Sequence, residues 1–293
     1  MKNAHPPVSL ITGASAGIGR ALAETLLREG HFVYAGYRNS DRARASYGDL
    51  WHVDRLKPVR LDVTRQSEIA TVMRAVRAEQ GRLDNLINNA GFGVYGAFEE
   101  LSEQELRAQF ETNFFGATSM CRAALPLLRA SDRARIINVS SILGQLVLPT
   151  GSAYCGSKWA LEAFSDCLRY EVRHFGIEVV LVEPGLIRTE FKDRILYSKA
   201  AREQNPESLY RHLNRKMAEN EYGRLVTSAQ AAAGKIADVL RKKRPGPRYR
   251  IGVDSQIYYA LKRVLPARFI DWTFRLAVWN AWRGEKSKRT LSV

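Results

Sequence analysis

The chain has 293 residues, of which 45% are hydrophobic and 26% are charged, so disorder over most of its length is excluded and one large α/β domain is expected. Its 45 lysines and arginines against 30 acidic residues give a net charge of +15, and residues 241–293 hold 14 of the basic and 3 of the acidic side chains. Three cysteines and five histidines without ligand spacing argue against a disulfide framework or a metal site, and no apolar run reaches the roughly 18 residues of a membrane span. We therefore expect an intracellular, cytoplasmic protein, peripheral to a membrane as the alternative.

The first predicted elements are a strand, a glycine-rich turn and a helix. Residues 8–12 form a short apolar run, residues 18–29 have helical periodicity, and Gly30 stands where a helix C-terminus favours glycine. The turn between them reads Thr-Gly-Ala-Ser-Ala-Gly-Ile-Gly. A glycine turn that leads into a helix N-terminus can bind the phosphates of a dinucleotide.

The same alternation continues along the chain. Expected strands are 32–37, 59–63, 83–88, 135–139, 178–182 and 249–253, and expected helices are 67–79, 103–128, 152–175 and 228–241. Regular alternation predicts a Rossmann-type doubly wound α/β fold, a parallel sheet of about seven strands with helices on both faces. Residues 1–253 are expected to form this cofactor-binding and catalytic domain.

Two later segments depart from the alternation. Residues 191–222 are polar with scattered aromatic side chains, which predicts a helical lid over a substrate site. Residues 254–293 form a basic, aromatic extension with two helical stretches that break at Pro266. This extension could cover the pocket, contact a second subunit or lie on an anionic membrane surface, and the sequence leaves all three open.

A proton-transfer pair lies in the predicted helix 152–175. Tyr154 and Lys158 are four residues apart and share one helix face. A free tyrosine has a pKa of about 10, and an ammonium about 4 Å away contributes on the order of 4 kcal/mol, enough to lower that pKa by about three units. A dinucleotide site combined with such a pair predicts hydride transfer.

Taken together, these motifs resemble the short-chain dehydrogenase/reductase family. The glycine spacing, Asn89-Ala90-Gly91 after the fourth strand and Ser141 thirteen residues before Tyr154 carry the resemblance over residues 8–190. It is strongest to the hydroxysteroid and retinol dehydrogenase branch. The resemblance implies an enzyme that transfers a hydride between nicotinamide and a carbonyl or alcohol, with Tyr154 as proton donor and acceptor.

The resemblance also assigns roles to single residues. It implies that Ser141 donates to the substrate oxygen, that Lys158 tunes Tyr154 and that Asn113 holds a water in the proton relay, which completes the catalytic set. The cofactor-binding residues that it implies are Gly13, Ser15, Gly17, Ile18, Gly19, Arg38, Asp62, Val63, Asn89, Ala90, Gly91, Tyr154, Lys158, Pro184, Gly185 and Thr189.

The end of the second strand predicts the choice of cofactor. An enzyme that prefers NAD usually places an acid here, whereas this chain has Tyr37 followed by Arg38. A guanidinium can bind a 2′-phosphate through two hydrogen bonds, so NADP(H) is preferred over NAD(H). Asp41 could weaken this preference by pairing with Arg38.

The segments expected beside the nicotinamide are largely apolar, which favours a hydrophobic steroid-, retinoid- or lipid-like substrate over the alternative of a small polar one. The expected substrate residues are Phe92, Val94, Leu143, Gln145, Leu148, Leu186 and Phe191. We expect a homodimer or homotetramer formed through helix 152–175 and the Asn113 helix, because helix 152–175 is apolar on two faces. No nucleic-acid partner is expected, and a non-enzymatic basic binding protein is the least favoured interpretation.

Overall fold

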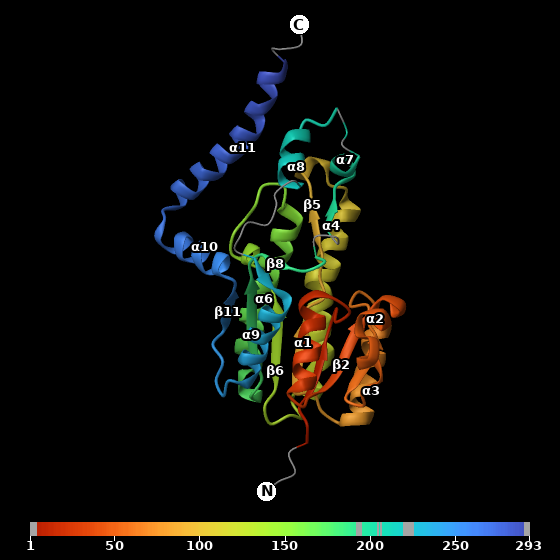
Figure 1. The fold of residues 1–293 in the computed structure, drawn as a ribbon. Helices are drawn as coiled ribbons and strands as arrows, with labels where there is room; N and C mark the ends of the chain where they lie inside the picture. The colour runs from red at the N-terminus through yellow and green to blue at the C-terminus, as the bar shows by residue number, and fades with distance from the viewer. Residues whose placement is uncertain (1–4, 192–194, 204, 206, 219–225, 290–293) are drawn as a thin grey trace.

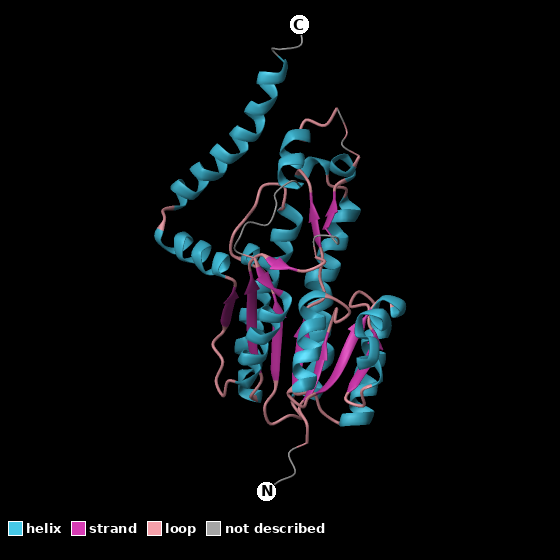
Figure 2. Cartoon of the chain, viewed as in Figure 1, coloured by secondary structure: helices cyan, strands magenta, loops and turns pink. Residues whose placement is uncertain are grey.

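The computed structural model describes residues 5–191, 195–203, 205, 207–218 and 226–289. Within these residues, a seven-stranded parallel sheet has the order β11-β7-β6-β4-β1-β2-β3 (Figures 1 and 2). Its strands are β1 (Val8–Ile11), β2 (Phe32–Tyr37), β3 (Leu56–Arg60), β4 (Asn85–Asn88), β6 (Arg135–Val139), β7 (Glu178–Pro184) and β11 (Arg248–Ile251). The predicted doubly wound α/β fold is confirmed.

Helices cover both faces of the sheet (Figure 2). They are α1 (Gly17–Arg28), α2 (Ser40–Tyr47), α3 (Gln66–Gln80), α4 (Glu103–Phe110), α5 (Ala117–Leu128), α6 (Ser152–Val172) and α9 (Ala229–Arg241). Successive β1 side chains enter opposite cores: Leu10 packs with α3, α5 and α6, and Ile11 packs with α1 and α9. Strands buried on both faces explain the continuous apolar runs in the sequence.

The third strand lies earlier than predicted. The expected strand 59–63 is observed as β3 over Leu56–Arg60, and Pro58 pairs opposite Ala35. Because β3 is the edge strand, the missing N–H of Pro58 costs no ladder hydrogen bond on the outer side. Asp62 and Val63 consequently lie beyond the strand, in the loop at its carboxyl end.

The predicted long helix 103–128 is interrupted. A π-helical turn over Glu111–Gly116 separates α4 from α5 and contains the buried Asn113. Gly116 in this turn approaches Val63 closely, since an added Cβ would stand 2.5 Å from Val63 Cγ2. Such wide turns inside helices are often found at functional sites.

Smaller elements complete the rim of the sheet. Strand β5 (Gly93–Tyr95) pairs with β9 (Ile195–Tyr197), and β8 (Ile187–Arg188) pairs with β10 (Thr227–Ser228). The lid expected at 191–222 contains β9, α7 (Lys199–Arg202) and α8 (Arg211–Ala218), while residues 192–194, 204, 206 and 219–222 of that prediction lie outside the described part.

The C-terminal extension forms two helices, α10 (Val253–Val264) and α11 (Ala267–Arg289), which meet at Pro266. In Figure 1 they leave the sheet after β11 and run along the outside of the molecule, where α11 contacts α8. Among the described residues, no helix combines the length and hydropathy needed to cross a bilayer.

Candidate active site

The turn between β1 and α1 is shaped by two glycines in the left-handed region. Gly13 has φ +64°, and an added Cβ would lie 2.9 Å from Ala90 Cα. Gly17 has φ +56°, and a Cβ added there would lie 3.3 Å from Thr189 Cβ. The α1 N-terminus has no side-chain cap and no acidic residue in its first turn, so its N–H groups suit the phosphates of a dinucleotide.

Gly19 does not line the cavity that this turn borders. An added Cβ there would lie 2.4 Å from Asn89 Nδ2 and 2.6 Å from the Gly13 carbonyl oxygen. The Asn89 amide donates to the carbonyl oxygens of Thr12 at 3.0 Å and Gly13 at 3.1 Å. The structure therefore places Gly19 where it lets Asn89 tie the turn to the end of β4.

At one end of the cavity, Arg38 and Asp62 lie on the wall with Ser15, Ile18 and Val63. Arg38 is exposed and forms no ion pair with Asp41 or with any other described residue. Asp62 Oδ1 also accepts hydrogen bonds from Thr64 N at 3.0 Å and Thr64 Oγ1 at 2.8 Å. The carboxylate of Asp62 thus caps its own turn while it faces the cavity.

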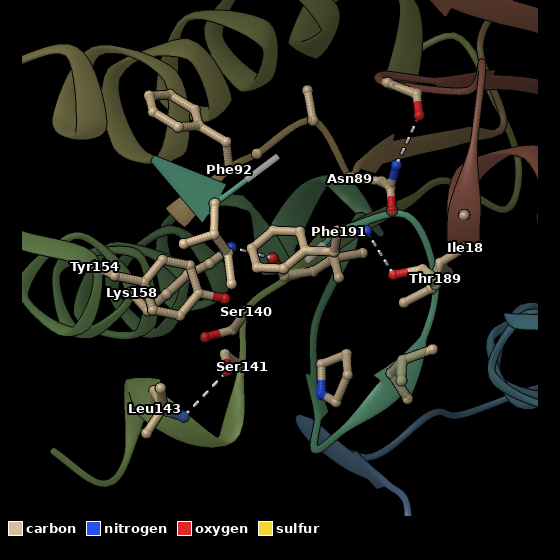
Figure 3. Close-up of a pocket in the computed structure, with 18 of the residues that line it drawn as sticks. Ile18, Asn89, Phe92, Ser140, Ser141, Leu143, Tyr154, Lys158, Thr189 and Phe191 are labelled. Atoms are coloured by element: carbon tan, nitrogen blue, oxygen red, sulfur yellow. Dashed lines mark hydrogen bonds between the residues drawn. The ribbon is translucent and has the colours of Figure 1, made fainter. Parts of the chain in front are cut away.

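The first two turns of α6 present Tyr154 and Lys158 to the cavity, beside Ser141, which follows the end of β6 (Figure 3). Lys158 Nζ donates to the Val139 carbonyl oxygen at 2.9 Å and stands 5.8 Å from the Tyr154 ring centroid. Burial lowers the pKa of Lys158 to about 8, although the nearby Glu162 carboxylate opposes this shift. A lysine whose pKa lies near neutral pH can supply either a positive charge or a proton.

Two serines, not one, lie on the wall beside Tyr154. Ser141 Oγ accepts a hydrogen bond from Leu143 N at 3.1 Å, as Figure 3 shows. Ser140 Oγ is buried and has no hydrogen-bond partner among the described residues. The family spacing selects Ser141, and the geometry adds Ser140 as a second hydroxyl at the same place.

Asn113 lies behind the cavity wall rather than on it. Its Oδ1 accepts from Phe92 N at 3.1 Å, and its Nδ2 donates to the Phe92 carbonyl oxygen at 3.0 Å and to Ser157 Oγ at 3.3 Å. Asn113 and Lys158 meet at Gly91, where an added Cβ would lie 3.1 Å from Asn113 Oδ1 and 3.8 Å from Lys158 Nζ. The observed contacts of Asn113 hold the Phe92 segment beside the lysine.

The whole cavity, with its expected cofactor and substrate parts together, is mostly apolar and has a volume of about 930 Å³. Its wall includes Gly13, Gly17, Asn89, Ala90, Gly91, Pro184, Gly185 and Thr189 of the expected cofactor set and Phe92, Leu143, Leu148, Leu186 and Phe191 of the expected substrate set.

Val94 and Gln145 are the expected substrate residues that do not line the cavity. Val94 is 1% exposed, and its N–H donates to Gln109 Oε1 at 2.6 Å. The Gln145 side chain turns away and donates to Glu162 Oε2 at 3.1 Å, while its carbonyl oxygen accepts from Lys262 Nζ. Alternation along β5 and a hydrogen bond to α6 thus remove both side chains from the site.

Several wall residues were not among the expected site residues, although the segments that contain them were expected near the pocket. Tyr95 stacks on Tyr154 with ring centroids 5.6 Å apart, and Tyr258 and Phe274 reach the cavity from α10 and α11. The aromatic content of the extension was the available signal for the last two.

Asp254, at the start of α10, is the missed residue with the most unusual surroundings. It is 7% exposed, and Oδ2 accepts from Leu186 N at 2.6 Å, whereas Oδ1 has no hydrogen-bond partner among the described residues. The carboxylate fits between two glycines, because an added Cβ would lie 2.2 Å from it at Gly185 and 2.3 Å at Gly252. In sequence it resembles an ordinary helix-cap acid.

The model of the family described as short chain dehydrogenase matches residues 7–199, which include the glycine turn, Ser141, Tyr154 and Lys158. The chain belongs to the short-chain dehydrogenase family. It is therefore an NAD(P)-dependent oxidoreductase with the Rossmann-type fold of that family.

Full-length relatives of this short-chain dehydrogenase are found among curated proteins and solved structures. It is 35% identical to a 3-ketodihydrosphingosine reductase of Bacteroides thetaiotaomicron, over 93% of this chain and 98% of that protein. It is 30% identical to an NADPH-dependent 3-dehydrocapnine reductase of Ornithobacterium rhinotracheale, over 91% and 95%. A crystal structure of a Streptomyces avermitilis short-chain dehydrogenase matches with a TM-score of 0.76 and 33% identity, over 98% and 99%.

Proposed function

We propose that this short-chain dehydrogenase is an NADPH-dependent reductase of a bulky, lipid-like ketone. The observation that carries the proposal is the large, mostly apolar cavity with Tyr154, Lys158 and Ser141 on one wall. A site of this kind binds through buried apolar area and orients the substrate through few polar groups.

The residues present suit carbonyl reduction. When bound at the glycine turn, NADPH would supply the hydride for the carbonyl carbon. Ser141 Oγ donates a hydrogen bond to the carbonyl oxygen and orients it, and Tyr154 Oη delivers the proton that completes the alcohol. Lys158 favours the tyrosinate that remains, because its positive charge stabilises the negative one.

NADPH is favoured over NADH by the charge at the end of β2. Arg38 lies on the cavity wall, and the position before it holds Tyr37 rather than an acid. One of the two curated relatives above is named as NADPH-dependent, which supports the same choice.

A large apolar substrate is supported by the cavity wall and by relatives named as reductases of 3-ketodihydrosphingosine and 3-dehydrocapnine. Each methylene enclosed contributes about 0.8 kcal/mol, so three more enclosed carbons should improve kcat/KM by roughly fiftyfold. The alternative is a small polar carbonyl or alcohol.

The test is a substrate series with NADPH. The purified protein is assayed with NADPH and 3-ketodihydrosphingosine or ketones of increasing chain length, and with NADP+ and small hydroxy acids or sugars in the reverse direction. We expect kcat/KM to rise with chain length, and Tyr154→Phe to lose turnover by about a thousandfold while it still binds NADPH. Faster turnover of the small polar compounds would contradict the substrate class, and an active Tyr154→Phe variant would contradict the mechanism.

A further inference from the structure

Helix α11 is apolar on two opposite faces. At ~100° per residue, Ile270, Phe274 and Val278 form one stripe, and Phe269, Trp272, Leu276 and Trp279 form another ~180° away. The first stripe is half-buried, and Phe274 reaches the wall of the active-site cavity. The second stripe, which we term the outer stripe, is exposed, with Trp272 at 55% and Leu276 at 39%.

Helix α10 also exposes apolar side chains. Ile257, Leu261 and Val264 are each at least 44% exposed, and Val264 reaches 80%. Figure 1 shows both helices on the outside of the molecule, with α11 extending past the sheet. We term α10 and α11 together the arm. Exposed apolar area of this extent along the arm marks an interaction surface.

The charge of the arm distinguishes between a second copy of the chain and a lipid surface as the partner of the outer stripe. Arg263 and Arg268 are exposed on these two helices, and the Asp271 carboxylate pairs with Arg275 at 2.8 Å. With 8 basic against 3 acidic residues over 253–289, two such arms would repel each other, whereas anionic lipid headgroups would attract them.

The arm is also joined to the active site. Lys262 Nζ lies 4.7 Å from the Trp159 ring centroid and donates to the Gln145 carbonyl oxygen, which holds α10 against the body. Tyr258 and Phe274 line the cavity from the same two helices whose other faces are exposed. A surface that held the outer stripe would therefore lie next to the cavity wall.

We infer that α10 and α11 lie on the surface of an anionic lipid bilayer, with the outer stripe among the acyl chains and the basic residues at the headgroups. This placement brings the cavity wall to the bilayer, where a lipid-like substrate is dissolved. The inference extends beyond the proposed reaction and does not require it.

Flotation of the full-length protein with vesicles tests the inference. We expect binding to phosphatidylcholine vesicles that contain phosphatidylglycerol, weaker binding without phosphatidylglycerol, and a decrease as salt rises. Trp272→Ser with Leu276→Ser should weaken binding by about tenfold or more, because the outer stripe no longer enters the interface. Phe175→Ser with Leu209→Ser changes two similarly exposed residues off the arm and should leave binding unchanged.

A second measurement uses the unaltered protein. Vesicles with brominated acyl chains should quench its tryptophan fluorescence more than unbrominated vesicles of the same headgroup composition. NADPH titration of the Trp272→Ser/Leu276→Ser variant reports whether it is folded, independently of any substrate.

Three results would overturn the inference. They are absence of flotation with phosphatidylglycerol, equal flotation of the outer-stripe and control variants, and a change in oligomeric mass caused by the outer-stripe variant without lipid. The last result would assign the stripe to a second copy of the chain.

Discussion

Arg38 is the residue on which the proposed cofactor choice depends. Because its guanidinium is exposed on the cavity wall and unpaired with Asp41, it is available to a 2′-phosphate. We expect NADPH to bind about ten to a hundred times more tightly than NADH, and Arg38→Asp to reverse the order. Fluorescence titration measures both, with Arg44→Asp in the following helix α2 as the control. Preference of the wild type for NADH would refute the interpretation.

Lys158 predicts how the reduction responds to pH. Its pKa of about 8 lies below the usual lysine value because the side chain is buried. As pH rises through this value the lysine loses its charge, so Tyr154 becomes a weaker acid and the reduction rate falls. The measurement is kcat for reduction from pH 6 to 10, where Lys158→Arg should remove this limb since it stays charged. A rate that is constant through pH 9 would contradict the assignment.

We expect Asp254 to affect binding of the nicotinamide end of the cofactor and not of its adenosine end. Its carboxylate accepts from Leu186 N and lies against Gly185, in the segment expected to bind the nicotinamide carboxamide, and its second oxygen has no partner among the described residues. Asp254→Asn should weaken NADPH binding by about tenfold, because a charge-assisted hydrogen bond becomes a neutral one. Binding of adenosine 2′,5′-bisphosphate, which lacks nicotinamide, should not change. Asp238→Asn is the control, and equal loss for both ligands would indicate a general structural effect.

At the scale of elements, Gly19 and Gly234 form a matched pair for substitution, because one helix glycine is crowded and the other faces open space. Gly19 in α1 has Asn89 Nδ2 and the Gly13 oxygen within 2.6 Å of an added Cβ, whereas Gly234 in α9 has nothing within 4 Å. Gly19→Ala should lower the free energy of unfolding by about 1–3 kcal/mol and weaken cofactor binding, because the turn must move. Gly234→Ala should raise it by about 0.5–1 kcal/mol. Urea denaturation measures the free energy of unfolding of both variants. Equal changes in the two would show that the close approach of Asn89 and Gly13 to Gly19 does not limit the side chain at that position.

The element boundaries that differ from prediction share one cause. The edge position of β3 tolerates Pro58, and the contact between Gly116 and Val63 accompanies a π-helical turn in an otherwise helical pattern. Neither neighbour is close in sequence. Local periodicity predicted that these elements exist, and packing decided where they begin and end.

At the scale of the whole molecule, we expect a homodimer, because the outer face of α6 exposes apolar side chains. Its outer face carries the exposed Cys167 and Tyr170, and Phe115 is also exposed, on the π-helical turn that contacts α6. Burial of this face against a second copy would remove a large apolar patch from water. Light scattering should give twice the chain mass of 33.1 kDa at micromolar concentration, and Tyr170→Glu should give a monomer. A monomeric wild type would count against the dimer, whereas the outer-stripe variant should leave the mass unchanged.

The sequence by itself determined the order of strands and helices along the chain, the glycine turn and the Tyr154–Lys158 pair. These features depend on interactions within a few residues: apolar periodicity, glycine at the positive φ of Gly13, and one helical turn between the tyrosine and the lysine. Such interactions are readable in the chain itself.

Only the tertiary structure decided which side chains meet at the cavity. The Gln145 side chain donates to Glu162, and Val94 is buried with its backbone N–H donating to Gln109, so neither side chain reaches the site where the sequence placed it. Asp254 and Phe274 reach it although they lie far beyond the matched motifs. The physical reason is that a side chain's direction follows from hydrogen bonds and packing with partners distant in sequence, as between Asp254 and Leu186, 68 residues apart.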